Sequence, residues 1–233
     1  RKPFLLSSSW SFHHEEEPVK MIECVTLENN HLFSGNPIYE QHKLRYSSII
    51  KRQSWDVPVI RGMEYDSYDN PSAYYLIRRD DSGKAIGVSR LYPTDRPYML
   101  QQAFPHLVTR TDLPQESGVW EGSRFCIEAS LPPAERKQIV HEIVVAYLEF
   151  ALAYNISNII GVMYPVYWKN IFIQSGGNVE WMGDIHRSEE GHKIIAGNLK
   201  VSQAVLDHVR NTTEIFNAVL NHGYVPSEKR AAA

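Results

Sequence analysis

The chain has 233 residues, of which 43% are hydrophobic and 22% charged, and 24 Lys and Arg nearly balance 27 Asp and Glu. This composition is ordinary for a globular protein and excludes an intrinsically disordered chain. The formal net charge of −3 argues against a general nucleic-acid binder, whose surface would be strongly basic. Two distant cysteines, Cys24 and Cys126, exclude a disulfide framework and favour a reducing, cytoplasmic compartment.

The two ends of the chain differ from the domain that we predict over residues 21–226. Residues 1–20 hold only a short apolar Phe4-Leu5-Leu6, too short for a secretory signal, so we expect an N-terminal extension. We expect residues 227–233 to form a flexible tail. The sequence contains no run of about 18 apolar residues, so no transmembrane helix is predicted.

Hydrophobic periodicity predicts the elements of the first half. In chain order they are a strand at 21–27, a helix at 36–50, a loop at 55–69, a hairpin of strands at 73–78 and 85–92, and a strand at 119–128. Four prolines between positions 93 and 118 exclude a long element there.

Helices and strands alternate in the second half. We expect a helix from Pro132 to Tyr154, a strand at 158–163, a helix at 166–175, strands at 179–182 and 193–201, and a helix at 202–220. A strand meander followed by this alternation predicts a single-domain α/β protein, a three-layer sandwich on a mixed sheet.

Familiar catalytic motifs are absent from the sequence. It has no Gly-rich dinucleotide fingerprint and no phosphate-binding loop. His141-Glu142 begins a zinc-protease motif, but Val145 stands where its second histidine would be. The ten histidines show no metal-ligand spacing, so we expect no metal site.

Charged and aromatic side chains gather instead between positions 45 and 125, inside otherwise apolar elements. A charge inside a strand must be paired or must serve a ligand, because burying it alone costs several kcal/mol. A structural ion-pair network is therefore one explanation of this cluster, and a ligand site is the other. The cluster comprises Arg45, Arg52 and Trp55; Met63–Asp69 with the pair Asp66 and Asp69; Arg90; and Glu121–Phe125.

In the last part of the cluster, strand geometry would point neighbouring charged side chains to opposite faces of the sheet. Residues two apart in a strand share a face, so Glu121 and Ser123 would point one way and Arg124 the other. A bulge at Gly122 would re-aim Arg124.

These ordered motifs resemble those of the acyl-homoserine-lactone synthases, the autoinducer synthases of bacterial quorum sensing. The family's Arg, aromatic, Arg and Trp spacing is matched by Arg45, Ile49, Arg52 and Trp55, with Ile49 in place of the aromatic residue. Further matches are Met63–Asp69, Arg90, Pro93-Thr94, Arg96–Met99 and Glu121–Phe125. The likeness runs from about Met21 to Gly183.

The resemblance implies synthesis of an N-acyl-L-homoserine lactone from S-adenosylmethionine and an acyl thioester, with release of 5′-methylthioadenosine. The thioester is expected on acyl carrier protein, or else on coenzyme A, with a long acyl chain that is unsubstituted or 3-hydroxylated. S-Adenosylmethionine is consumed, so no cofactor is expected. The implied fold resembles the N-acetyltransferase (GNAT-like) fold, whose sheet splays to hold a thioester arm.

The resemblance also implies roles for individual residues. Glu121 is the expected base for the α-amine, whose ordinary pKa is about 8; Asp66, Asp69 and Arg45 complete the catalytic group. Substrate binding is expected from Arg52, Trp55, Met63, Arg90, Phe104, Ser123, Arg124 and Phe125, with Trp55 and Phe125 on the adenosine. The acyl chain is expected to contact Met99, Val144, Leu148, Gly161, Val162, Met163 and Phe172.

Two other functions fit the same residues. One is a different GNAT-like N-acyltransferase that uses acyl-CoA, and the other is a non-catalytic ligand-binding domain. Binding of S-adenosylmethionine separates the first from an autoinducer synthase, and lactone formation separates the second.

Overall fold

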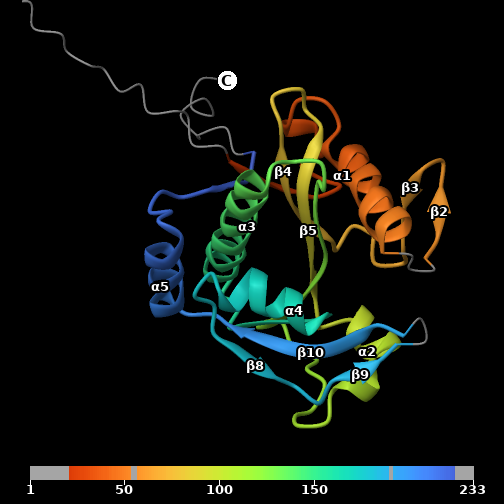
Figure 1. Ribbon diagram of the computed structural model, residues 1–233, viewed down its shortest axis with the longest axis vertical. Coiled ribbons are helices and arrows are strands. Elements are labelled where there is room, and N and C mark those ends of the chain that lie inside the picture. The colour runs from red at the N-terminus through yellow and green to blue at the C-terminus, as the bar shows by residue number, and fades with distance from the viewer. Residues whose placement is uncertain (1–20, 54–56, 189–190, 224–233) are drawn as a thin grey trace, which may run out of the picture.

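A mixed sheet of nine strands runs through the computed structural model, which describes residues 21–53, 57–188 and 191–223 (Figure 1). Its order is β11 (Leu220–Asn221), β1 (Ile22–Val25), β4 (Tyr74–Arg79), β5 (Ala85–Pro93), β6 (Val119–Ile127), β7 (Asn158–Met163), β10 (Lys193–Lys200) and β8 (Val179–Trp181), with β9 (His186–Arg187) also paired to β10. β2 (Val59–Ile60) and β3 (Met63–Glu64) form a separate hairpin.

Helices cover both faces of this sheet, as Figure 1 shows. α3 (Pro133–Ala153) and α5 (Gln203–Thr213) pack on one face, where they enclose the first hydrophobic core. α1 (Pro37–Arg45) lies on the other face over β4, β5 and β6 and covers the second core. The predicted three-layer sandwich is confirmed.

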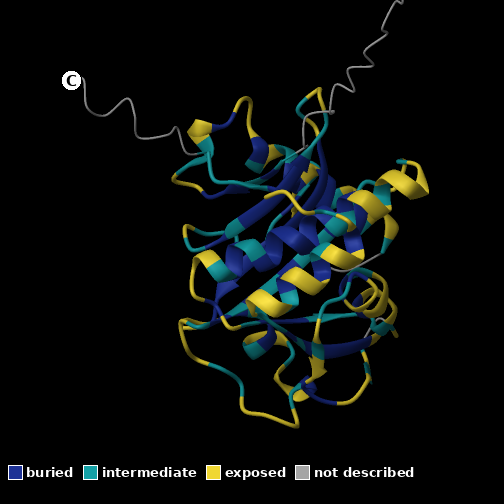
Figure 2. Cartoon of the chain, turned by 90° about the vertical axis from the view of Figure 1, so that its left-hand side faces the viewer, coloured by how far each residue is buried: buried dark blue, intermediate teal, exposed yellow. Residues whose placement is uncertain are grey.

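Shorter helical segments complete the chain. They are α2 (Met99–Ala103), α4 (Pro165–Tyr167), the 3₁₀ turns η1 (Asn30–Leu32) and η3 (Pro105–Leu107), and the π-helical turns η2 (Tyr46–Arg52) and η4 (Trp168–Ile173). Figure 2 shows the buried residues gathered in the sheet and on the inner sides of the helices. Within the described ranges, no helix is both long enough and apolar enough to cross a membrane.

The sheet opens between β6 and β7. These strands run parallel and pair at only three positions, Val119 with Asn158, Trp120 with Ile159 and Glu121 with Ile160. Each then continues with its other neighbour, β6 with β5 and β7 with β10. The predicted splay is therefore present, and it begins next to Gly122.

Some predicted elements differ from the structure. The expected loop at 55–69 contains the β2–β3 hairpin. The expected helix at 202–220 ends at Thr213, because Glu214 adopts a left-handed conformation with a φ of 59°. The chain then returns to β1 as strand β11, where Glu149 of α3 accepts hydrogen bonds from the amides of Val219 and Leu220 at 3.1 and 3.0 Å.

Candidate functional site

Three arginines and three carboxylates form a closed ring of alternating charge on the α1 side of β5 and β6. Around the ring they are Arg45, Glu64, Arg124, Asp66, Arg90 and Asp69, each joined to both neighbours by an ion pair. Arg45 donates from both terminal nitrogens to the two oxygens of Asp69, at 2.7 and 2.8 Å. Arg90 holds Asp66 in the same way, at 2.5 and 2.9 Å.

Elements far apart in sequence supply this ion-pair ring. Arg45 ends α1, Glu64 ends β3, and Arg90 and Arg124 come from β5 and β6. Asp69 lies in the turn after β3, where its carboxylate accepts the Asp66 amide at 2.9 Å. The ring thus fastens α1 and the segment after β3 onto the sheet.

Burial makes the ring strongly interdependent. Arg45, Glu64 and Arg90 are fully buried. Burial raises the pKa of Asp69, but the hydrogen bonds and charge of Arg45 outweigh it, so the pKa of that carboxyl lies well below its usual range. The pKa of Asp66 is lowered in the same way, with burial opposed by Arg90 and Arg124. The ring is neutral overall, and the network explanation accounts for much of the charge in this cluster.

A β-bulge directs Arg124 into the ring. Val88 pairs with Cys126 and Arg90 with Ser123, so Ser89 alone faces two residues of β6. Arg124 has a φ of 56°, which is uncommon for a residue with a side chain. The bulge predicted at Gly122 therefore lies at Arg124, and it places Arg124 on the same side of the sheet as Ser123.

Glu121 is completely buried below the ring. Its two carboxylate oxygens accept the backbone amides of Met99 and Leu100, at 3.1 and 2.6 Å, and so fix the start of α2. Burial raises the pKa of Glu121 to about 7, although the Leu100 amide opposes this shift. A carboxyl with this pKa changes between its protonated and ionised forms near neutral pH.

A cavity of about 300 Å³ occupies the splay between β6 and β7. Its lining includes Gly122–Phe125 of β6 on one wall and Ile159, Ile160, Val162 and Met163 of β7 on the other. Some lining residues belong to the core on the α1 side and others to the core on the α3 side. The cavity therefore passes through the sheet and joins its two faces.

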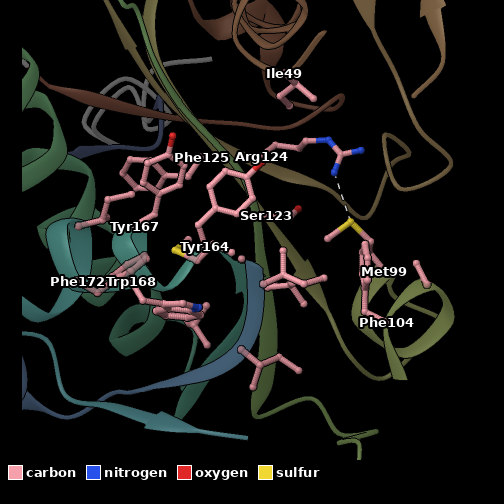
Figure 3. A pocket seen from close by; sticks show the side chains of 18 of the residues that line it. Ile49, Met99, Phe104, Ser123, Arg124, Phe125, Tyr164, Tyr167, Trp168 and Phe172 are labelled. Carbon is pink, nitrogen blue, oxygen red and sulfur yellow. Dashed lines mark hydrogen bonds between the residues drawn. The ribbon is translucent and has the colours of Figure 1, made fainter. Parts of the chain in front are cut away.

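The two ends of the cavity differ in chemistry. On the α1 side it is lined by Asp66, Ser123 and Arg124, together with Gln53 and Tyr68. On the α3 side it ends among Phe125, Tyr147, Ile159, Trp168, Phe172 and Leu199. In Figure 3 the guanidinium of Arg124 points to Met99, whose sulfur accepts its hydrogen bond at 3.3 Å, while Phe125, Trp168 and Phe172 lie together across the cavity. This arrangement suits a ligand with a charged head and a long or bulky apolar group.

No group of three or more His, Cys, Asp or Glu within the described ranges could hold a metal ion.

Comparison with known proteins identifies the family. A sequence model of the autoinducer synthases matches residues 29–209, more than half of the chain. The chain belongs to this family. This autoinducer synthase is 31% identical over 175 residues to the acyl-homoserine-lactone synthase of Agrobacterium fabrum, a match that covers 73% of this chain and 82% of the relative. The isovaleryl-homoserine lactone synthase of Bradyrhizobium diazoefficiens is 29% identical over 167 residues, covering 70% and 72%. The protein is therefore an acyltransferase.

Solved structures give the same result for the fold. The CoA-dependent acyl-homoserine lactone synthase BjaI, in complex with MTA, matches with a TM-score of 0.75 at 25% identity, covering 87% of this autoinducer synthase and 92% of BjaI. The AHL synthase LasI matches with a TM-score of 0.65 at 28% identity, covering 78% and 89%. The mixed, splayed α/β sandwich predicted from the sequence is the fold of this family.

The structure brings many of the predicted site residues of the autoinducer synthase to the cavity wall. These are Asp66, Met99, Phe104, Ser123, Arg124, Phe125, Val162, Met163 and Phe172. Arg45, Asp69 and Arg90 belong to the ion-pair ring but do not line the cavity, and neither does Glu121.

Other predicted residues lie elsewhere. Arg52 is exposed and Met63 accepts a hydrogen bond from the Tyr65 hydroxyl, outside the cavity lining. Val144 and Leu148 are buried in the α3 core, which the amphipathic pattern of the helix could not separate from a cavity wall. Gly161 faces β6: a Cβ there would lie 2.6 Å from the Gly122 carbonyl oxygen. Trp55 lies outside the described residues.

Phe125 reaches the cavity from an unexpected side. Its ring lies 6.0 Å from that of Phe172, in the core on the α3 side, and therefore across the sheet from the ion-pair ring. This placement puts Phe125 at the apolar end of the cavity, away from Arg124. The role expected for it, on the adenosine, stays a prediction.

Sequence reasoning missed several residues of the site. Glu64 belongs to the acidic Met63–Asp69 segment and shares a face with Asp66 if the segment is extended, so the sequence did indicate that Glu64 could join the site. Tyr147, Trp168 and Ser89 had no such signal, because aromatic and small residues on buried elements are ordinary in a core.

Proposed function

We propose that this autoinducer synthase joins S-adenosylmethionine to an acyl thioester and closes the product to an N-acyl-L-homoserine lactone. The observation that carries the proposal is a single cavity with a charged end and an aromatic, apolar end, which passes through the splayed sheet. In the first step the α-amine attacks the thioester carbonyl, forms the amide and expels the thiol. In the second step the substrate carboxylate attacks its own Cγ and expels 5′-methylthioadenosine. S-Adenosylmethionine is consumed, and no resident cofactor is part of the proposal.

Glu121 is the proposed base of the first step. The amine must lose a proton to attack, and a carboxylate with a pKa of about 7 can accept one near neutral pH. Because Glu121 lies behind Met99 rather than on the cavity wall, the proton reaches it through water or after a shift of α2.

Arg124 is the proposed partner of the substrate carboxylate. Of the arginines expected to bind substrate, Arg124 lines the cavity, whereas Arg52 and Arg90 do not. Its guanidinium is oriented by Glu64 and Asp66, at 3.0 and 2.6 Å, so it does not have to be ordered when substrate binds. The carboxylate of Asp66 lines the same end, where it can hold the substrate ammonium.

The carrier of the acyl group has two candidates, and each has an observation in its favour. BjaI and MesI, two of the similar solved structures, are CoA-dependent acyl-homoserine lactone synthases, which favours coenzyme A. Exposed cations outside the ion-pair ring, Lys137, Lys169, Arg187 and Lys193, favour an acidic carrier protein. A comparison of kcat/KM for the same acyl group on the two carriers decides between them.

The test of the proposed function is a direct assay. The protein is incubated with S-adenosylmethionine and acyl-CoA or acyl carrier protein thioesters of 4 to 14 carbons, and the products are measured by mass spectrometry. We expect equal amounts of 5′-methylthioadenosine and lactone. An acylated amine without 5′-methylthioadenosine would indicate the rival N-acyltransferase, and no product from any donor would indicate a binding domain.

A further inference from the structure

We propose that Tyr147 limits the length of the acyl chain that this enzyme accepts, and that Ser89 and Gly122 hold its ring in place. The inference rests on the proposed function, because it names a specificity determinant of that site. The charged end of the cavity has to receive S-adenosylmethionine, so the acyl chain extends toward the α3 side, where Tyr147 stands.

Tyr147, in the middle of α3, lines the apolar end of the cavity. The residue is buried, with 2% of its surface exposed, and it lines the cavity together with Phe125 and Phe172. Its ring lies 5.4 Å from that of Phe172 and 6.4 Å from that of Phe125. Figure 3 shows Phe125 and Phe172 on this side. Tyr147 is therefore part of the wall that the end of a longer acyl chain would contact.

A hydrogen-bond chain fixes the orientation of this ring. Ser89 Oγ donates to the carbonyl oxygen of Ser123 at 2.9 Å, so its only hydrogen is used. The hydroxyl of Tyr147 is in contact with Ser89 Oγ and must be the donor of that bond. Both hydroxyls are buried, and leaving either without its partner would cost about 1 to 3 kcal/mol. The ring is thus tied to the carbonyl that the bulge of β6 leaves beside Ser89.

Gly122 makes the space that the ring occupies. A Cβ at position 122 would lie 2.8 Å from the Tyr147 hydroxyl oxygen and 3.0 Å from a carbon of its ring. The aromatic ring and a side chain at position 122 therefore compete for one volume, immediately beside the splay. Shortening Tyr147 should open this volume to the substrate, and adding a methyl group to Gly122 should push the ring into the cavity.

The decisive variant is Tyr147→Leu, and its matched control is Phe150→Leu. Both replace a buried aromatic residue of α3 by leucine, but Phe150 packs against Tyr74 and Trp120 and does not line the cavity. Each variant is given S-adenosylmethionine and an equimolar ladder of acyl thioesters on the carrier that the wild type prefers. The lactone products are then quantified.

For each variant we compare kcat/KM for a donor two carbons longer than the wild-type optimum with kcat/KM for the optimal donor. Tyr147→Leu should raise this ratio by about ten-fold or more, because one methylene group in an apolar pocket changes kcat/KM by about 10- to 200-fold. Phe150→Leu should keep the wild-type ratio, at lower thermal stability. Gly122→Ala should shift the optimum to shorter donors, and Gly122→Ala/Tyr147→Leu should move it back.

An unchanged product distribution in a folded, active Tyr147→Leu protein overturns the inference. If that variant does not fold, Gly122→Ala decides: a shift to shorter chains supports the inference, and the wild-type distribution overturns it. A wild-type protein that makes no lactone from any donor refutes the proposed function itself, so the two failures are distinguishable.

Discussion

Glu121 combines complete burial with a pKa of about 7, and this decides what its removal should do. If Glu121 is the base, Glu121→Gln should lower kcat by about 10²- to 10⁴-fold. The wild-type rate should fall below about pH 7, where the carboxyl becomes protonated, and this limb should be absent from the residual activity of the variant. Rates of 5′-methylthioadenosine release between pH 5.5 and 9 measure both effects.

Glu142→Gln is the control for that experiment. Glu142 is also buried and pairs with Arg78 at 3.0 Å, but it lies on α3 away from the cavity lining. Its loss should reduce stability and leave the pH profile of activity unchanged. If Glu121→Gln keeps the acid limb or the full rate, the carboxylate only anchors α2.

The ion-pair ring should respond strongly to the loss of one charge. Asp69→Asn removes a carboxylate that Arg45 and Arg90 share, and leaves buried guanidinium charge without compensation. Breaking a buried pair in this way costs about 3 to 5 kcal/mol, and urea unfolding should show a loss of this size. Asp184→Asn, which breaks the exposed pair with Arg110, should change stability by less than about 1 kcal/mol. A similar small change in Asp69→Asn would contradict the proposed interdependence.

At the level of elements, the sequence predicts long periodic segments well and short ones poorly. Strand β7 is found at its predicted limits, Asn158–Met163, because a buried β-branched run between turns is a strong signal. β2 and β11 are two residues long, and no periodicity can be detected in two residues. Their positions follow from tertiary contacts instead, as with the Glu149 carboxylate that holds β11.

The candidate site was predictable to a different extent. Its charged residues stood out because charge inside apolar elements demands a partner. Gly122 indicated a bulge nearby, but the closure into a ring was not predictable, since it depends on the left-handed conformation of Arg124 itself. The apolar end was the least predictable part, because Tyr147 on a buried helix resembles any core residue until the splay is known.

The contact between β6 and β7 should depend on the glycine at the start of the splay. Gly161→Ala places a methyl group 2.6 Å from the Gly122 carbonyl oxygen, so one strand must shift. We expect a loss of about 1 to 3 kcal/mol in unfolding free energy, measured by urea denaturation, and reduced lactone synthesis. Gly118→Ala is the control, because the nearest atom to its new methyl group would be 3.9 Å away. Equal stability of the two variants would show that β7 adjusts freely.

At the scale of the whole molecule, the ion-pair ring, the splayed strands and the cavity lie in contact with one another and connect the two hydrophobic cores. Residues of both cores line the cavity. The ring joins Arg45 of α1 to Arg90 of β5 and Arg124 of β6, next to the splay. Global stability should therefore report on buried titratable groups near the site. Two of these, His42 and Glu121, have pKa values shifted in opposite directions.

His42 lies in α1, stacked on Tyr65 at 3.8 Å and hydrogen-bonded through Nδ1 to the Glu64 carbonyl. Burial, together with the charge of Arg45, lowers the pKa of His42 from 6.5 to about 4. Between these values the unfolded chain binds the proton and the folded one does not, so His42 makes stability fall as the pH falls. Glu121 has the opposite sign. Its pKa rises from 4.5 to about 7, so the folded state holds the extra proton and stability falls as the pH rises through this range.

The two contributions should cancel between about pH 4.5 and 6.5, each being close to 1.4 kcal/mol per pH unit. Removing one group exposes the other. Relative to the wild type, the unfolding free energy of His42→Gln should decrease with rising pH by about this slope, and that of Glu121→Gln should increase by it. Urea unfolding at half-unit steps from pH 4.5 to 6.5 measures both slopes. If the two variants show slopes of the same sign, at least one of these groups has its ordinary pKa in the folded protein. If His42→Gln/Glu121→Gln follows the wild-type pH dependence while the single variants diverge from it, the opposing proton linkage of these two residues is established.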